Sequence, residues 1–129
     1  MSLAGRTSAG DRTPSPRPVA SGWWRAGLAL AVVVQLVVLY NATQPSVGGL
    51  ASVPGLDKLV HAAVFASVMA AGRRARLPRV PLLVLTVVQA PVSELVQAGL
   101  LPRRSGDPFD VVADLTGCLI GWWLTRERR

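Results

Sequence analysis

Apolar residues along this chain gather into four long runs separated by polar or proline-rich stretches. Residues 23–40 form the first run, which only Arg25 and Gln35 interrupt. Residues 59–72 form the second run, which needs residues 56–58 in front of it to approach the length of a membrane span. A helix rises about 1.5 Å per residue and crosses the apolar core of a bilayer in about 20 residues. The first run therefore predicts a transmembrane helix, whereas the second, taken alone, fits either a buried helix or a transmembrane one.

The third and fourth runs carry polar residues inside otherwise apolar segments. Residues 80–101 form the third, in which Pro91 predicts a kink and Pro102 an end. The fourth begins at Asp107 and Pro108, a strong helix start, because aspartate caps free N–H groups and proline loses nothing at the first helical position. Together the four runs predict an all-α fold, an integral membrane four-helix bundle.

The remaining stretches define the limits of that bundle. Residues 1–22 are rich in Ser, Pro, Gly and Arg and lack apolar periodicity, which predicts a disordered tail before a single domain at residues 23–129. A cleaved signal peptide is the alternative for the first run. The long tail in front of it and the lack of a small-x-small cleavage site behind it favour a transmembrane helix. The single cysteine, Cys118, lies in an apolar run and is expected to be a small buried residue.

Charge sets the expected orientation in the membrane. The net charge of +7 comes almost entirely from arginine, and the arginines cluster between apolar runs, which is typical of membrane loops rather than of nucleic-acid surfaces. The tail, residues 72–79 and the C-terminus are rich in arginine, so we expect a multi-pass protein of the cell membrane with both termini cytoplasmic. All four tryptophans would then lie at the cytoplasmic interface, namely Trp23, Trp24, Trp122 and Trp123.

This topology gathers the polar residues capable of chemistry on the outer side of the membrane. Within each helix they are spaced by three or four positions, so each set shares one helical face. We expect Asp57 and His61 to lie within reach of Glu94 and Arg104 across helix boundaries. The predicted outward-facing polar pocket consists of Asp57, Lys58, His61, Glu94, Gln97, Arg104, Asp107, Asp110 and Asp114.

The order of these motifs resembles the VanZ-like family of small bacterial integral membrane proteins. The resemblance covers residues 55–121 and is carried by D-K-x-x-H from Asp57, E-x-x-Q from Glu94, R-x-x-D-x-x-D from Arg104 and G-x-x-x-G from Gly117. It implies a four-helix membrane protein, and some relatives are associated with resistance to the glycopeptide teicoplanin. It supplies no biochemical activity. Where the family usually has asparagine, this chain has Asp114, which adds a negative charge. The paired glycines predict close helix approach.

Several of these residues also have a structural interpretation. Asp57 and Asp107 are good N-caps, and Asp110 lies where an acid favours the helix dipole. Glu94 and Asp114 are harder to explain in this way, because both lie roughly two turns inside a predicted span. A charged residue at the centre of a membrane helix costs about 2.5–3.5 kcal/mol on insertion scales. We therefore expect both carboxyl groups to be paired or protonated inside the bundle.

Three functions from different classes remain open. The first is a binding protein whose pocket engages an anionic lipid or a lipid-linked cell-wall precursor, with Lys58, Arg104 and helix N-termini supplying positive potential. The second is an outer-leaflet enzyme with His61 or Glu94 as general base. The third is a structural subunit that only fixes helix register and partners other envelope proteins. Membrane lipids are expected partners in each case, and nucleic acid in none.

The charge balance of the pocket limits which ligands it could bind. Five carboxyl groups stand against two cationic side chains, so the pocket is not a plain anion site. Either the carboxylates pair with those cations, or Glu94 or Asp114 holds a proton. A divalent metal held by His61, Glu94, Asp110 and Asp114 is a further alternative. Because these residues offer a single nitrogen donor, we expect no metal and no cofactor.

Overall fold

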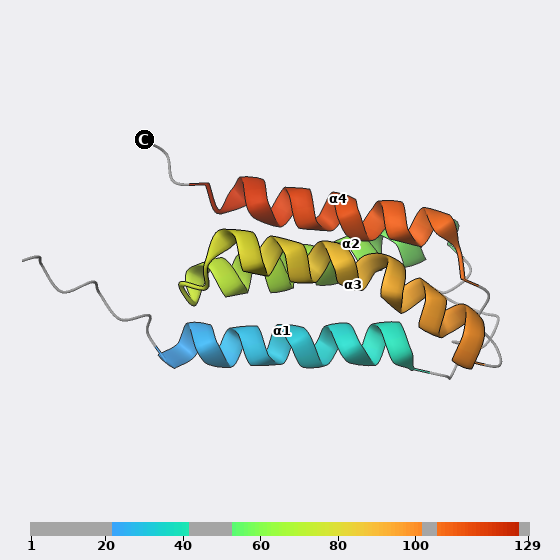
Figure 1. Ribbon diagram of the computed structural model, residues 1–129, viewed down its shortest axis with the longest axis horizontal. Coiled ribbons are helices and arrows are strands. Elements are labelled where there is room, and N and C mark those ends of the chain that lie inside the picture. The colour runs from blue at the N-terminus through green and yellow to red at the C-terminus, as the bar shows by residue number, and fades with distance from the viewer. Residues whose placement is uncertain (1–21, 42–52, 102–105, 127–129) are drawn as a thin grey trace, which may run out of the picture.

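The computed structural model describes residues 22–41, 53–101 and 106–126, and this part of the chain is helical throughout (Figure 1). The elements are α1 (Gly22–Tyr40), α2 (Leu56–Arg74), α3 (Arg79–Leu100) and α4 (Pro108–Leu124). No strand occurs among these residues, so the predicted all-α class is confirmed. The predicted disordered tail lies outside the described residues except for Gly22, which begins α1.

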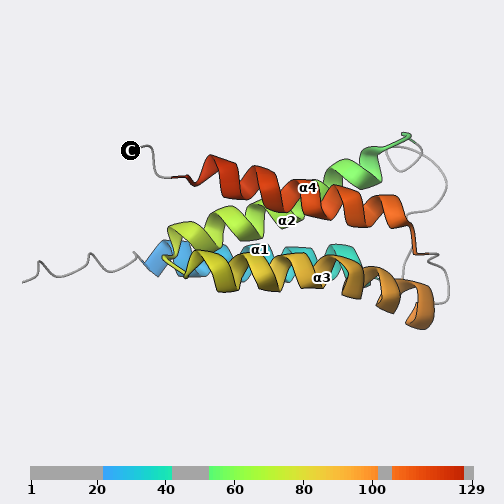
Figure 2. The same cartoon turned by 45° about the horizontal axis from the view of Figure 1, so that its top comes forward.

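The helices alternate in direction, so that α1 and α3 run one way and α2 and α4 the other (Figures 1 and 2). We call the end where α2 and α4 begin the acidic end, and the opposite end the arginine end. At the arginine end Arg74 lies 5.0 Å from the ring centroid of Trp24, and Arg79 lies 5.7 Å from that of Trp122. These are cation–π contacts. The tryptophans near both ends of the sequence therefore share one end of the bundle, as predicted.

α2 and α4 begin at different kinds of N-cap residue. The N-cap of α2 is Gly55, which has a left-handed φ of 80° and whose carbonyl accepts the N–H of Leu59 at 3.1 Å. Asp57 therefore lies in the first turn, and its predicted N-cap role is wrong, because the chain enters the helix through the glycine two residues earlier. The N-cap of α4 is Asp107, as predicted, and its carboxylate accepts the N–H of Phe109 at 2.9 Å.

α2 is the central helix, and it packs most extensively against α4 and next against α1. Two glycines of α4 allow the closest approach. A Cβ added at Gly117 would overlap the backbone of Ala62, and one at Gly121 would lie 2.6 Å from the carbonyl oxygen of Ala66. The prediction that the G-x-x-x-G pair permits close helix approach is confirmed. The first three turns of α4 are thereby held against the first turns of α2.

The apolar core draws on all four helices but is small. Its members are Leu39 of α1, Val64 and Phe65 of α2, Ala90 of α3 and Cys118 of α4. Cys118 is 1% exposed, which confirms its prediction as a small buried residue. Since α1 contributes Leu39 to this core, it is an integral part of the bundle.

α3 bends in its C-terminal half (Figure 1), and it contains Pro91, the residue predicted to kink it. Its buried face is largely polar. Thr86 and Ser93 on this face each donate a hydrogen bond to a carbonyl of their own helix, at 3.0 and 2.8 Å. The buried residues of α3 are Leu82, Thr86, Ala90, Ser93, Glu94 and Gln97. The polarity therefore increases towards the acidic end.

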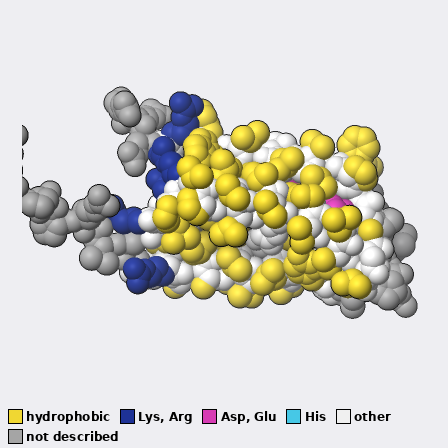
Figure 3. Space-filling view, in the orientation of Figure 1, with side chains coloured by type: hydrophobic (Ala, Val, Ile, Leu, Met, Phe, Trp, Pro, Cys, Tyr) yellow, Lys and Arg dark blue, Asp and Glu magenta, His cyan; other side chains and the backbone are white. Residues whose placement is uncertain are grey.

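Hydrophobic side chains are spread along the whole length of the face drawn in Figure 3, and Lys and Arg side chains gather at one end of it. Large apolar side chains are exposed on every helix, among them Leu30, Leu59, Leu85 and Leu119 at 65–69%. α1 and α3 are long and apolar enough to cross a membrane. In an apolar 18-residue stretch of α1, 11% is buried, and in one of α3, 33% is buried. The core helix of a soluble protein is mostly buried.

Replacing Gly117 by alanine should destabilise the bundle, because the new Cβ would collide with the backbone of Ala62 and push α4 away from α2. Overpacking of this kind costs about 1–3 kcal/mol. The matched control is Gly27→Ala in α1, where nothing lies within 4 Å of the added Cβ and alanine is the better helix former. Equilibrium unfolding of the purified protein in detergent would measure both variants. Equal stability of the two would contradict the close packing of α4 on α2.

Candidate functional site

Lys58 gathers three carboxylates at the rim of the acidic end. Its Nζ lies 2.8 Å from Asp107 Oδ2, 3.1 Å from Asp110 Oδ1 and 3.2 Å from Asp57 Oδ2. An ammonium group has three N–H donors, and all three are directed to carboxylates here. Lys58 is therefore engaged within the protein, and the positive potential expected from it for binding phosphate is compensated.

Asp107 connects this lysine to the start of α4. Its carboxylate accepts from Lys58 and also from the backbone N–H of Phe109. These hydrogen bonds, with that from Lys58 the larger cause, hold the pKa of Asp107 below its ordinary value. The residue lies just before α4, outside the helical segment, and stays ionised at neutral pH.

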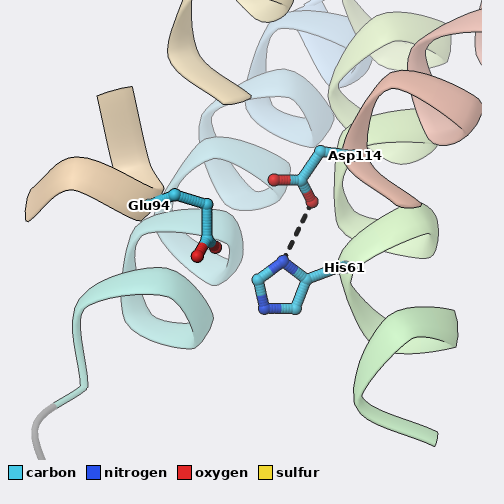
Figure 4. Close-up of side chains that lie close together, drawn as sticks. All are labelled: His61, Glu94 and Asp114. Atoms are coloured by element: carbon cyan, nitrogen blue, oxygen red, sulfur yellow. Dashed lines mark hydrogen bonds and ion pairs between the residues drawn. The ribbon is translucent and has the colours of Figure 1, made fainter. Parts of the chain in front are cut away.

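Deeper in the bundle, His61 of α2 pairs with Asp114 of α4. Nδ1 of His61 lies 3.0 Å from Asp114 Oδ1 (Figure 4), and the two residues are only 4% and 0% exposed. Nε2 of the same ring lies 3.9 Å from Asp110 Oδ2. A carboxylate is an acceptor, so a neutral His61 in this pair carries its proton on Nδ1. The pairing therefore fixes both the orientation and the tautomer of the ring.

Glu94 of α3 completes the inner part of the site. Its Oε2 accepts the backbone N–H of Asp107 at 2.8 Å, which satisfies a donor at the start of α4 and places negative charge where the helix dipole favours it. The other oxygen, Glu94 Oε1, is buried without a hydrogen-bond partner among the described residues, and so is Asp114 Oδ2. Ligand atoms of His61, Glu94 and Asp114 lie within 4.8 Å of one another (Figure 4).

The structure thus brings together most of the predicted pocket, which we call the acidic-end cluster: Asp57, Lys58, His61, Glu94, Asp107, Asp110 and Asp114. The prediction that His61 lies near Glu94 is confirmed. Asp57 is at the exposed rim and joins the cluster through Lys58. Gln97 is 2% exposed and lies on the buried face of α3. Arg104 lies outside the described residues, so its contacts stay a prediction.

Three buried polar residues were missed by the sequence reasoning. Gln35 of α1 is 1% exposed, and the signal for it was its isolation within an apolar run. Thr86 and Ser93 of α3 are 2% and 0% exposed, and their spacing of seven positions places them on one stripe of the helix. Both hydroxyls are satisfied by carbonyls of α3, so they fill the interior rather than add chemistry to the cluster.

Comparison of the chain with protein-family models, with curated protein sequences and with solved structures found no match. The resemblance to VanZ-like proteins therefore rests on the motifs alone, and function must be inferred from the residues of the acidic-end cluster.

Replacing Lys58 by glutamine should lower stability at neutral pH and make it less sensitive to acid. The depressed pKa of Asp107 contributes stability that is present above its unfolded-state pKa, about 3.9, and is lost as pH falls through the lower folded-state value. Without Lys58 that pKa returns towards normal, and the acid-dependent loss shrinks. Thermal unfolding between neutral pH and pH 2 in detergent would measure this, with Arg126→Gln, which removes an exposed positive charge at the arginine end, as control. Parallel pH profiles for wild type and Lys58→Gln would show that Lys58 does not stabilise these carboxylates.

Proposed function

We propose that this chain is a four-span integral membrane protein of the VanZ-like kind, with both termini in the cytoplasm and the acidic-end cluster facing the outer leaflet. The apolar exterior of every helix supports contact with lipid, because soluble monomers rarely expose apolar surface of this extent. The arginines of the described residues gather at the opposite end, which supports the orientation, whereas Arg103 and Arg104 lie outside the described residues. α2 and α4, at 19 and 17 residues, are near the minimum length for a span and run antiparallel to α1 and α3.

Burial is the strongest support for a membrane bundle. A core helix of a soluble protein can match the length and hydropathy of α1 and α3, but it is mostly buried, whereas these two helices are mostly exposed. A signal sequence can match α1, but α1 packs against α2 and buries Gln35 and Leu39. These features favour α1 and α3 as two permanent membrane spans. Because α2 and α4 pack beside them in antiparallel order, they would lie in the same bilayer.

The proposed function of the inner residues of the cluster, His61, Glu94 and Asp114, is to bind the polar headgroup of an envelope lipid or a lipid-linked cell-wall precursor, and thereby to lower sensitivity to glycopeptides. The observation that carries it is the pair of buried carboxylate oxygens, Glu94 Oε1 and Asp114 Oδ2, that have no partner within the described residues. A buried acceptor left unsatisfied costs about 1–3 kcal/mol, and more when charged. A ligand with hydroxyl or ammonium donors removes that cost. Because Lys58 is engaged by carboxylates, this part of the chain favours such donors over bare phosphate.

The pairing of His61 with Asp114 supports a second candidate, an enzyme of the outer leaflet. A carboxylate on Nδ1 holds an imidazole in the tautomer whose Nε2 is free to accept a proton, so His61 would act as general base on a water or hydroxyl. Binding and catalysis can be separated with His61→Gln. An enzyme would keep its affinity for the headgroup and lose turnover, whereas a binding protein would show no turnover before or after the change.

The proposed topology predicts opposite labelling of two exposed positions. Val53 and Leu77 are 50% and 38% exposed and lie at the acidic and the arginine end. Single cysteines at these positions, in a Cys118→Ala background, should react with a membrane-impermeant maleimide from opposite sides of intact cells. Only Val53→Cys should label without permeabilisation. Arg126→Cys serves as a second cytoplasmic control. Labelling of Val53→Cys and Leu77→Cys from the same side would exclude the four-span topology.

The proposed site predicts a loss of phenotype in two inner variants. Glu94→Gln keeps the shape of the side chain and removes its charge, and His61→Ala removes the imidazole. Both variants should insert and fold, yet lose any glycopeptide tolerance that the wild type confers on a bacterial host. Asp57→Asn, at the exposed rim, should retain it. Susceptibility to teicoplanin, with protein levels in the membrane quantified in parallel, is the measurement. Full activity of both folded inner variants would leave the cluster with a structural role only.

A further inference from the structure

His61, Glu94 and Asp114 come from three different helices and converge at one buried point (Figure 4). They offer an imidazole nitrogen and two carboxylate oxygens, the donors that bind divalent first-row cations in proteins. Their residues are 4%, 7% and 0% exposed. The sequence predicted no metal, because one nitrogen donor seemed insufficient. The geometry of the three donors gives reason to revise that expectation.

Each of the two carboxylates has one oxygen that makes no hydrogen bond among the described residues. Glu94 uses Oε2 to accept from Asp107, and Oε1 is buried without a partner among the residues described. Asp114 uses Oδ1 to face His61, and Oδ2 is likewise unpartnered in this part of the chain. Two ionised carboxylates side by side in an apolar bundle repel one another and lose their hydration. A divalent cation would compensate both charges and satisfy both free oxygens.

The distances fit a metal site with little rearrangement. Donors at about 2.0–2.2 Å from one ion can lie at most about 4.4 Å apart, and the three donors here lie within 4.8 Å of one another. Small side-chain movements would close this difference. Without an ion, the Nδ1 proton of His61 bonds to Asp114 Oδ1 at 3.0 Å. When Nδ1 binds the ion, that proton would leave it and Nε2, which lies 3.9 Å from Asp110 Oδ2, would carry the ring proton.

A further carboxylate is placed where metal-bound histidines usually have one. Ligating imidazoles commonly direct their second ring nitrogen to a carboxylate, which orients the ring and raises its basicity. With Nδ1 directed towards Asp114, Nε2 of His61 lies 3.9 Å from Asp110 Oδ2, which is longer than a hydrogen bond but within reach of a small rotation of the ring. The carboxylate of Asp110 is itself held by Lys58. The site therefore has both its ligands and an outer group that could orient one of them.

We infer that His61, Glu94 and Asp114 form a binding site for a divalent first-row cation, with Zn²⁺ bound more tightly than Mn²⁺. A set of one nitrogen and two oxygens suits either ion, and zinc binds such sites more strongly in the general affinity order. Calcium is disfavoured because it takes six to eight oxygen ligands. Three protein ligands leave at least one coordination position for water or for a headgroup oxygen. The inference does not rest on the proposed lipid-binding function. With the ion bound, a headgroup would reach the site through this open position on the metal instead of through the two carboxylate oxygens.

The test is zinc titration of the full chain, purified without a polyhistidine tag, stripped with chelator and reconstituted in lipid nanodiscs. Calorimetry should show one saturable Zn²⁺ site per chain, with Mn²⁺ weaker. Asp114→Asn and Glu94→Gln should each weaken Zn²⁺ affinity at least tenfold, because each replaces a ligand carboxylate by a neutral amide. Asp57→Asn is the matched control at the same end of the bundle and should bind Zn²⁺ like the wild type.

The circular dichroism signal of the helices, measured for each variant, separates lost binding from lost folding. The wild-type titration tests the inference whether or not a variant folds. Folded wild type that shows no saturable Zn²⁺ binding overturns the inference. Zn²⁺ binding that survives both inner substitutions, or that falls equally in Asp57→Asn, also overturns it. If the wild type binds no Zn²⁺ but still needs Glu94 for glycopeptide tolerance, the metal site fails and the headgroup proposal stands.

Discussion

The close approach of α4 to α2 is the contact on which the other features of this protein depend. Gly117 and Gly121 bring the backbone of α4 against Ala62 and Ala66, and no side chain larger than hydrogen fits between them. This approach sets the depth and rotation of Asp114, which lies one turn before Gly117 and meets His61 at 3.0 Å. A small-residue contact therefore positions two polar groups that an apolar bundle would not otherwise bring together.

Electrostatics then divide the acidic end into two layers. At the rim, Lys58 neutralises part of the charge of Asp57, Asp107 and Asp110, in a setting that remains partly exposed. In the inner layer, Glu94 and Asp114 are buried with His61 and carry oxygens without partners in the described chain. The carboxylates of the rim pair with Lys58, whereas a proton, a cation or a ligand would have to compensate the buried carboxylates of the inner layer. The chemical interest of the molecule lies in that inner layer.

Much of this arrangement could be predicted from the sequence, because helical periodicity and proline, glycine and arginine placement are local signals. They predicted the helices, the N-cap at Asp107, the burial of Cys118 and the gathering of polar residues at one end. The N-cap of α2 was misassigned because Gly55 has a left-handed conformation that no spacing reveals. The partner of each carboxylate could not be predicted either, since it depends on helix rotation to within one residue. Lys58 therefore seemed free for a ligand, although three aspartates engage it.

The pairing of His61 with Asp114 is the central claim, and the sequence offers a direct way to test it. His61 is the only histidine in the chain, so ¹⁵N-histidine labelling reports on this one ring without ambiguity. In chelator-treated protein in lipid nanodiscs, NMR should find a proton on Nδ1, and the Nδ1 signal should move in Asp114→Asn but not in Asp57→Asn. A ring protonated only on Nε2, with signals unchanged in Asp114→Asn, would contradict the account.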